Sequence, residues 1–267
     1  MMKKSLIWIG AIIGIGLCFV GGFSVGKYFS EKDKKKGNQT VTETKKEEEK
    51  EEIKEEIFKE ADLSESEKTK LKEIIEILPE KASLTNLEKD LTNNEKISFA
   101  MAYDSLINNH ASPYLSGTII KNILSQSFGS DLNVKLENIK CSLCDVDYYI
   151  YDSKTDVYGL NPEHPGHGAS GIDAYNVVNS YKQNGNKIVL EVDKMYYATS
   201  DSFEFAGYYS NYNDLINNKN YKEIKDENLW GDFESVYKLE KDNLPTYTYT
   251  FEKAGDNFIF KGYELSK

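Results

Sequence analysis

The sequence predicts an α+β domain, with helices packed on a curved antiparallel sheet, behind an N-terminal transmembrane helix and a charged spacer. Two observations predict the domain. Apolar residues recur with a helical period up to Gly129 and with the period of two of a β-strand after it. The strand-like segments also come in pairs joined by tight turns and do not alternate with helices, which favours antiparallel pairing.

Residues 1–30 are predicted to be a membrane anchor. The 22 residues from Ser5 to Gly26 carry no charge, and as a helix they would span about 33 Å, against a hydrocarbon core of about 30 Å. A cleaved signal peptide is one alternative. Signal peptides, however, have a shorter apolar run than residues 5–26, and they end in a small-residue cleavage site that is missing here. A lipoprotein is another, but Leu17 stands before Cys18 where a small residue is needed. We therefore expect residues 5–26 to contact the lipid bilayer.

The lysines around this segment support two orientations. Five lysines follow it between residues 27 and 36 and two precede it, so the positive-inside rule would place the domain inside the cell. A very short basic N-terminus before the first apolar helix is instead typical of a signal anchor, which leaves the domain outside. We expect the second arrangement: a single-pass protein of the cell membrane with an extracytoplasmic C-terminal domain.

Residues 31–62 are predicted to be a charged low-complexity spacer. Almost no side chain before Ile53 can be buried, so no core offsets the entropy of ordering the segment. Residues 63–267 are enough for one globular domain. Residues 61–267 hold 21 lysines and 33 acidic residues, a net charge of −12, and the chain contains no arginine. This charge would repel a polyanion, so we expect no binding to nucleic acid.

Three helices open the domain. Ser-x-x-Glu at 64–67 and Thr-x-x-Glu at 92–95 are capping boxes, and each precedes an apolar stripe of helical period. Pro79 ends the first stripe, and Asp104 interrupts the second. The third helix is expected over 116–128 and stops at the following glycine.

Strand-like segments follow the helices. An Asn-Gly turn joins the third to the fourth, and Ala-Gly-Asp joins the last two, as in β-hairpins. A further helix is expected around 232–239. The order of elements is similar to that of cone-shaped cystatin-like and NTF2-like domains, by analogy of fold alone. The six segments are 133–140, 145–152, 173–183, 186–197, 246–253 and 257–265.

Two cysteines and two histidines form the candidate metal site: Cys141, Cys144, His164 and His167. Zinc takes four such ligands tetrahedrally, and C-x2-C is a favourable chelating pair, although H-x2-H is tighter than the usual spacing. In an extracytoplasmic domain, a disulfide between Cys141 and Cys144 is the simpler interpretation. The disulfide is therefore preferred, with zinc as the alternative and no other cofactor expected.

No catalytic residues are predicted. The chain contains no G-x-S-x-G, H-E-x-x-H, P-loop or G-x-G-x-x-G motif. A hydrolase using two unidentified carboxylates stays an alternative, because the sequence cannot select a pair among 33 acidic residues. Four aspartates lack the regular spacing of a calcium loop and are expected in a solvated loop: Asp145, Asp147, Asp152 and Asp156.

The arrangement resembles uncharacterised, single-pass, membrane-anchored surface proteins of AT-rich Gram-positive bacteria. A short basic start, one apolar helix and a Lys/Glu spacer carry the resemblance, together with a block ahead of the Asn-Gly hairpin. The residues of that block are Tyr151, Asp152, Tyr158, Asn161 and 164–168. The resemblance covers the architecture and residues 134–198, and it implies no activity.

The sequence therefore predicts a membrane-anchored extracytoplasmic binding or interaction domain. Paired strand tyrosines put one ring on each face of a sheet, and an outward ring can stack on a glycan or a protein partner. The ligand is unknown. The alternatives are a zinc-binding domain and a hydrolase.

Overall fold

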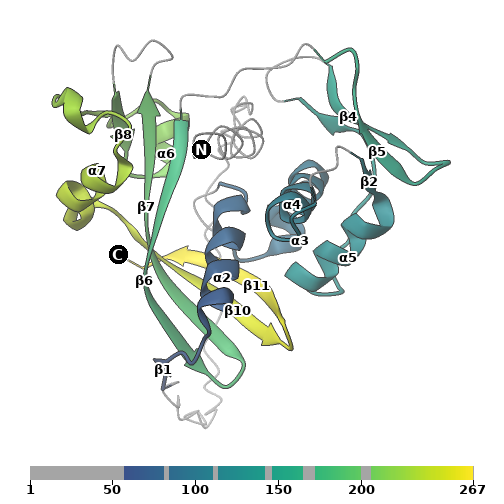
Figure 1. Cartoon of the computed structure of the whole chain (residues 1–267), viewed down its shortest axis with the longest axis horizontal. Helices are drawn as coiled ribbons and strands as arrows, with labels where there is room; N and C mark the ends of the chain where they lie inside the picture. The colour runs from purple at the N-terminus through teal and green to yellow at the C-terminus, as the bar shows by residue number, and fades with distance from the viewer. Residues whose placement is uncertain are drawn as a thin grey trace, which may run out of the picture. The chain divides into compact units, whose positions relative to one another are not determined.

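The computed structural model describes residues 57–80, 84–110, 114–141, 146–164, 172–199 and 206–266. These residues form an α+β structure of helices and antiparallel sheets (Figure 1). The predicted anchor over 5–26 and most of the predicted spacer lie outside the described residues. In the part of the chain that is described, no helix is long and apolar enough to cross a membrane.

The three expected helices are confirmed. Helix α2 (Glu65–Ile77) and helix α4 (Asn93–Leu106) both begin with complete capping boxes, and α3 (Leu87–Asp90) is a short turn between them. Helix α5 (Gly117–Phe128) is capped by the Ser116 hydroxyl and stops at Gly129, whose φ of 92° favours glycine.

Asp104 is buried although it interrupts the apolar face of α4. Its carboxylate lies 2.6 Å from Nδ1 of His110 and accepts a hydrogen bond from the Asn108 amide. A buried carboxylate needs such partners to offset its desolvation. Asp104 therefore fixes the end of the helix, where the His110 ring contacts its carboxylate.

The larger sheet has seven strands and curls around α2 (Figure 1). Its main path runs β1-β6-β7-β10-β11, and β8 pairs with β7 and β9. The two predicted hairpins, β6–β7 and β10–β11, are confirmed, with Gly185 at a φ of 59° in the first turn. The strands are β1 (Lys59–Glu60), β6 (Ile172–Asn184), β7 (Lys187–Thr199), β8 (Ala206–Tyr209), β9 (Lys222–Glu223), β10 (Thr246–Ala254) and β11 (Asn257–Leu265).

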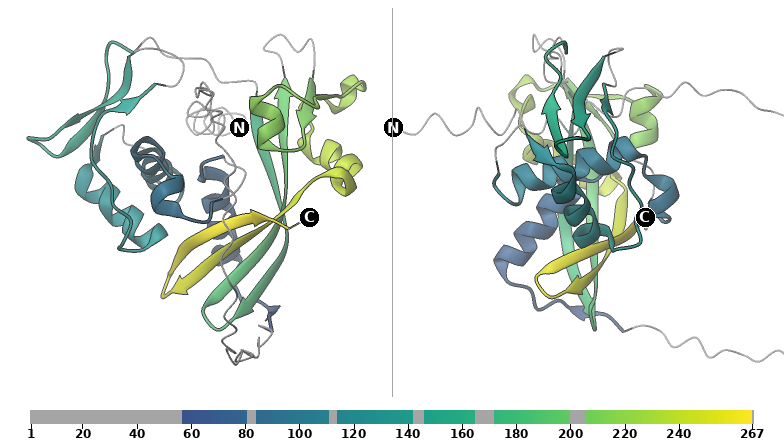
Figure 2. Two further views of the ribbon diagram at one scale, coloured as in Figure 1. Left: turned by 180° about the vertical axis from the view of Figure 1, so that it is seen from behind. Right: turned by 90° about the vertical axis from the view of Figure 1, so that its right-hand side faces the viewer.

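A second antiparallel sheet of four strands lies apart from the first (Figure 2). Its order is β2 (Leu115–Ser116), β5 (Val157–Leu160), β4 (Asp147–Asp152) and β3 (Ile139–Lys140). The expected strand over 133–140 is wrong except for its last two residues. The Asn93 side chain accepts a hydrogen bond from the Lys135 backbone, and Asn94 exchanges two with the Lys140 backbone. The Asn93 side chain thus binds a backbone group that a partner strand would otherwise bind, whereas Lys140 still belongs to β3.

The two larger of three buried clusters lie on opposite faces of the seven-stranded sheet. The larger one joins α2, α4 and α5 to the inner face, for example through Phe99, Phe128 and Phe260. The smaller one packs Met195 and Tyr197 of β7 beneath α7 (Phe233–Glu240), the helix expected around 232–239. The prediction of helices on one face holds for α2 and α5, whereas α7 covers the other. The connecting region also contains α6 (Tyr212–Ile216), η1 (Glu227–Leu229) and η2 (Lys241–Asn243).

Candidate functional site

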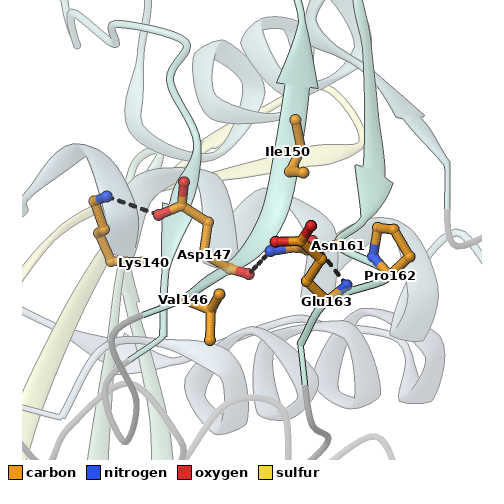
Figure 3. A pocket seen from close by; sticks show the side chains of 7 residues that line it. All are labelled: Lys140, Val146, Asp147, Ile150, Asn161, Pro162 and Glu163. Carbon is orange, nitrogen blue, oxygen red and sulfur yellow. Dashed lines mark hydrogen bonds and ion pairs between the residues drawn. The ribbon is translucent and has the colours of Figure 1, made fainter.

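An open hollow of about 400 Å³ lies at one end of the four-stranded sheet (Figure 3). Its lining mixes three apolar side chains with two carboxylates, one ammonium group and one amide. Small-ligand sites are mostly apolar with a few placed polar groups, so this lining is more polar than is usual for them. The residues are Val146, Ile150 and Pro162, with Lys140, Asp147, Asn161 and Glu163.

Asp147 organises one wall of the hollow. Its carboxylate lies 2.7 Å from Nζ of Lys140 and accepts a hydrogen bond of 2.8 Å from the Asn138 amide. These two hydrogen bonds hold the pKa of the Asp147 carboxyl below its usual value. Asp147 is therefore ionised at neutral pH, and its charge is compensated by Lys140.

Asn161 organises the opposite wall and is itself buried. Its amide nitrogen donates to the Asp147 backbone carbonyl at 2.7 Å, and its amide oxygen accepts from the Glu163 backbone at 3.0 Å. The His164 backbone N–H donates to the Asn161 carbonyl. This one side chain therefore ties the end of β5 to β4 and shapes the turn that leads to His164 (Figure 3).

The hollow brings the two predicted motifs to one place. Lys140 and Glu163 line it, and the next residues in the chain are Cys141 and His164. Cys141 is half-buried, and the His164 ring packs edge-on against Tyr148 with 4.6 Å between ring centroids. The sequence spacing of these motifs alone did not indicate that β3 and the end of β5 would lie on either side of β4, at the same hollow.

The complete candidate set is not tested by the structure, because Cys144 and His167 lie outside the described residues. Among the residues that are described, no group of three or more His, Cys, Asp or Glu side chains is arranged to hold a metal ion. The disulfide between Cys141 and Cys144 and the zinc site both stay predictions.

Two aspartates of the supposed solvated loop have separate structural roles. Asp156 accepts hydrogen bonds from the Thr118 backbone and hydroxyl at the start of α5 and from the Tyr151 hydroxyl. Asp152 binds the turn that follows it, through Lys154 and Thr155. Each carboxylate therefore stabilises local structure, which the sequence spacing did not reveal.

A second polar cluster, unforeseen in the sequence, is buried between the end of α2 and the larger sheet. Lys194 of β7 lies 2.9 and 3.2 Å from the two carboxylate oxygens of Glu80, and the Tyr196 hydroxyl donates to the same carboxylate at 2.7 Å. Burial alone would lower the pKa of Lys194, but the carboxylate of Glu80 holds that pKa well above its usual range. Burial and the same carboxylate raise the pKa of Tyr196.

Glu76, one turn earlier in the chain, accepts a hydrogen bond of 3.0 Å from the Asn176 amide of β6. Glu76 is exposed as a residue. Desolvation of its carboxyl by the neighbouring protein atoms raises its pKa to about 7, against the opposing effects of Asn176 and Lys194. Glu80 is fully engaged by Lys194 and Tyr196. Glu80 and Glu76 therefore join the end of α2 and the residues after it to the larger sheet.

The fold and the hollow define an α+β domain of two antiparallel sheets with a small surface site. Searches with the chain found no matching protein-family model, no matching curated protein and no matching solved structure. The resemblance to anchored surface proteins therefore stays a prediction.

Proposed function

We propose that the protein is a membrane-anchored, extracytoplasmic domain that binds a ligand at the hollow beside Asn161. The apolar run over 5–26 and its basic flank support the anchor, and the spacer would hold the domain away from the bilayer. One observation carries the binding role: an open hollow is lined by Asp147 and Asn161, which are joined by a hydrogen bond, and both chemistry-bearing motifs of the sequence begin beside it.

The fold analogy belongs to this proposal. In cone-shaped cystatin-like and NTF2-like domains a helix lies in a curved sheet, and α2 lies along the curled seven-stranded sheet in the same general way. The analogy concerns architecture alone and brings no ligand with it.

The sidedness is tested by labelling with a membrane-impermeant maleimide in intact cells. The full chain carries Leu239→Cys, at an exposed position of α7, in a background where Cys18, Cys141 and Cys144 are serine. We expect labelling without permeabilisation, and labelling of a matched Lys3→Cys variant only after permeabilisation. The reverse pattern would place the domain in the cytoplasm, and recovery of the chain in the soluble fraction would contradict the anchor.

The second candidate function is zinc binding through Cys141, Cys144, His164 and His167. The observation that favours it is that the neighbours of Cys141 and His164 line the same hollow. Zinc content and accessible thiols are measured together on the full chain, purified without chelator or reductant. One zinc per chain that is lost in Cys141→Ser and in His167→Ala would establish the metal site. No zinc and no reactive thiol at Cys141 or Cys144 would establish the disulfide.

A further inference from the structure

An exposed tyrosine lies against a glycine on the four-stranded sheet. Tyr114 is 63% exposed, and a methyl group added at Gly159 of β5 would lie 3.3 Å from its Cε1 and 3.5 Å from its Cδ1. A side chain at 159 would therefore require the Tyr114 ring to shift. The glycine therefore lets a solvent-exposed aromatic ring rest on the sheet.

This ring and one residue that lines the hollow, Ile150, share a face of the sheet. Gly159 is the cross-strand partner of Ile150 on β4, and such partners point to the same side. Ile150 is 40% exposed and lines the hollow. Tyr114, Ile150 and the residues that line the hollow therefore form an exposed strip. The strip crosses the sheet from β5 to β3, a distance of two strand spacings or about 10 Å.

The strip offers complementary groups to a sugar ring. An aromatic ring beside an aliphatic side chain fits the C–H face of a pyranose, and groups at its edge can bind hydroxyls. Lys140 and Glu163 stand at the hollow as exposed donor and acceptor, and Val146 and Pro162 add apolar surface. The hollow can thus hold a methyl group and bind the amide that carries it.

We propose that this strip binds a neutral oligosaccharide of N-acetylated amino sugars, with Tyr114 as the stacking platform and the hollow as the acetamido pocket. This deepens the proposed binding function and rests on it. The net charge of −12 over residues 61–267 disfavours a polyanionic glycan.

The composition of the strip favours a sugar over a protein partner. Stable protein interfaces bury about 800 Å² on each side around an apolar centre that is depleted in charge. Here two exposed apolar side chains, Tyr114 and Ile150, adjoin a hollow lined by Lys140, Asp147 and Glu163. That surface is too small and too charged for such a centre, and it fits a ligand of two or three sugar rings.

The test uses the full chain in lipid nanodiscs and two soluble tetrasaccharides. Chitotetraose contains four β-1,4-linked N-acetylglucosamine units, and cellotetraose has the same linkage without acetamido groups. Saturation-transfer NMR and titration measure contact and affinity. We expect chitotetraose to bind with the strongest transfer at its acetamido methyl groups, and cellotetraose to bind at least about tenfold more weakly.

Variants separate stacking from folding. Tyr114→Ala removes the platform and should weaken chitotetraose binding about tenfold, whereas Tyr114→Phe should keep it within about twofold. Tyr221→Ala is the matched control, because Tyr221 is 37% exposed and its ring also lies against a glycine, Gly207, away from the hollow. It should bind like the wild type. Unchanged melting of Tyr114→Ala shows that the domain is folded.

Three outcomes overturn the proposal: no binding of chitotetraose by the wild type, equal binding of both tetrasaccharides, or undiminished binding by Tyr114→Ala. The labelling experiment above does not depend on any sugar. A negative result here with external labelling there would refute the glycan ligand and leave the anchored binding domain standing.

Discussion

The buried ion pair between Glu80 and Lys194 is expected to be the point where one substitution costs the domain most stability. The two side chains are 6% and 3% exposed, and both carboxylate oxygens of Glu80 face the Lys194 ammonium. Glu80→Leu would leave the ammonium group buried without its counter-ion and the Tyr196 hydroxyl without its acceptor. Removing one partner of a buried pair costs about 3–5 kcal/mol.

Thermal unfolding of the full chain in detergent, followed by near-ultraviolet circular dichroism, measures this cost. A domain of about 200 residues loses roughly 2–4 °C of Tm per kcal/mol. Glu80→Leu should therefore lower the Tm by roughly 6–20 °C. Adding Lys194→Met removes the stranded charge, so the double variant should recover most of the loss.

The matched control is Lys238→Met, which breaks the exposed pair with Glu234 on α7. Exposed pairs contribute about 0–1 kcal/mol, so its Tm should hardly change. The reasoning is refuted if Glu80→Leu shifts the Tm no more than this control, or if the double variant is less stable than Glu80→Leu alone.

Three further predictions concern the pH dependence and the backbone. Because the pKa of Glu76 is raised, the contribution of this side chain to domain stability is complete below pH 4.5, its ordinary pKa, and is lost as the pH rises through 7. Glu76→Gln should therefore raise the Tm more at pH ~8 than at pH ~5. An equal change in Tm at both pH values would contradict this. Asp156→Ala removes the carboxylate that holds the start of α5 and should cost about 0.5–2 kcal/mol in chemical unfolding; no loss would show that this cap is dispensable. Gly262→Ala should cost roughly 1–3 kcal/mol, because Gly262 has a φ of 147° and a methyl group there would strike the Leu84 carbonyl. Gly255→Ala, in open space at a φ of 61°, should cost roughly 1 kcal/mol, and equal losses would refute the role of the contact.

Local signals allowed most helices and hairpins to be predicted. Capping boxes and glycine stops act within four residues, and the Asn-Gly turn fixes its own hairpin, so these elements depend little on distant partners. The strands β1, β5, β8 and β9 have two to four residues each, and long-range pairing stabilises them. A strand of that length carries too few alternating positions to stand out in a sequence.

The predicted strand over 133–138 failed for a physical reason. Its residues alternate, but the Lys135 N–H in its middle binds the side chain of Asn93, in the first turn of α4. That competition joins segments more than 40 residues apart. A sequence pattern indicates which secondary structure a segment prefers. It does not indicate which distant side chain will form hydrogen bonds with the backbone of that segment.

The candidate site could be predicted only in part. The sequence motifs indicated Cys141 and His164, and the structure shows that their neighbours line one hollow. The hydrogen bonds of Asn161 and the contact of Tyr114 with Gly159 depend on cross-strand register, which no local pattern encodes. The partners Glu80 and Lys194 are 114 residues apart in the chain, so the pair was invisible in the sequence.

The two-residue strand β1 would be the first part of the larger sheet to bear a pulling force applied to the N-terminal side of the domain. Lys59 and Glu60 pair with the edge of β6, and the Ala61 backbone donates to the Tyr181 carbonyl at 2.9 Å. A pull on the chain from the side of the predicted spacer would load these few hydrogen bonds first, and the long ladder between β6 and β7 only afterwards. We therefore expect β1 to separate from β6 at a lower force than β6 separates from β7. The chain would then lengthen by a few residues while α2 and the rest of the larger sheet stay folded.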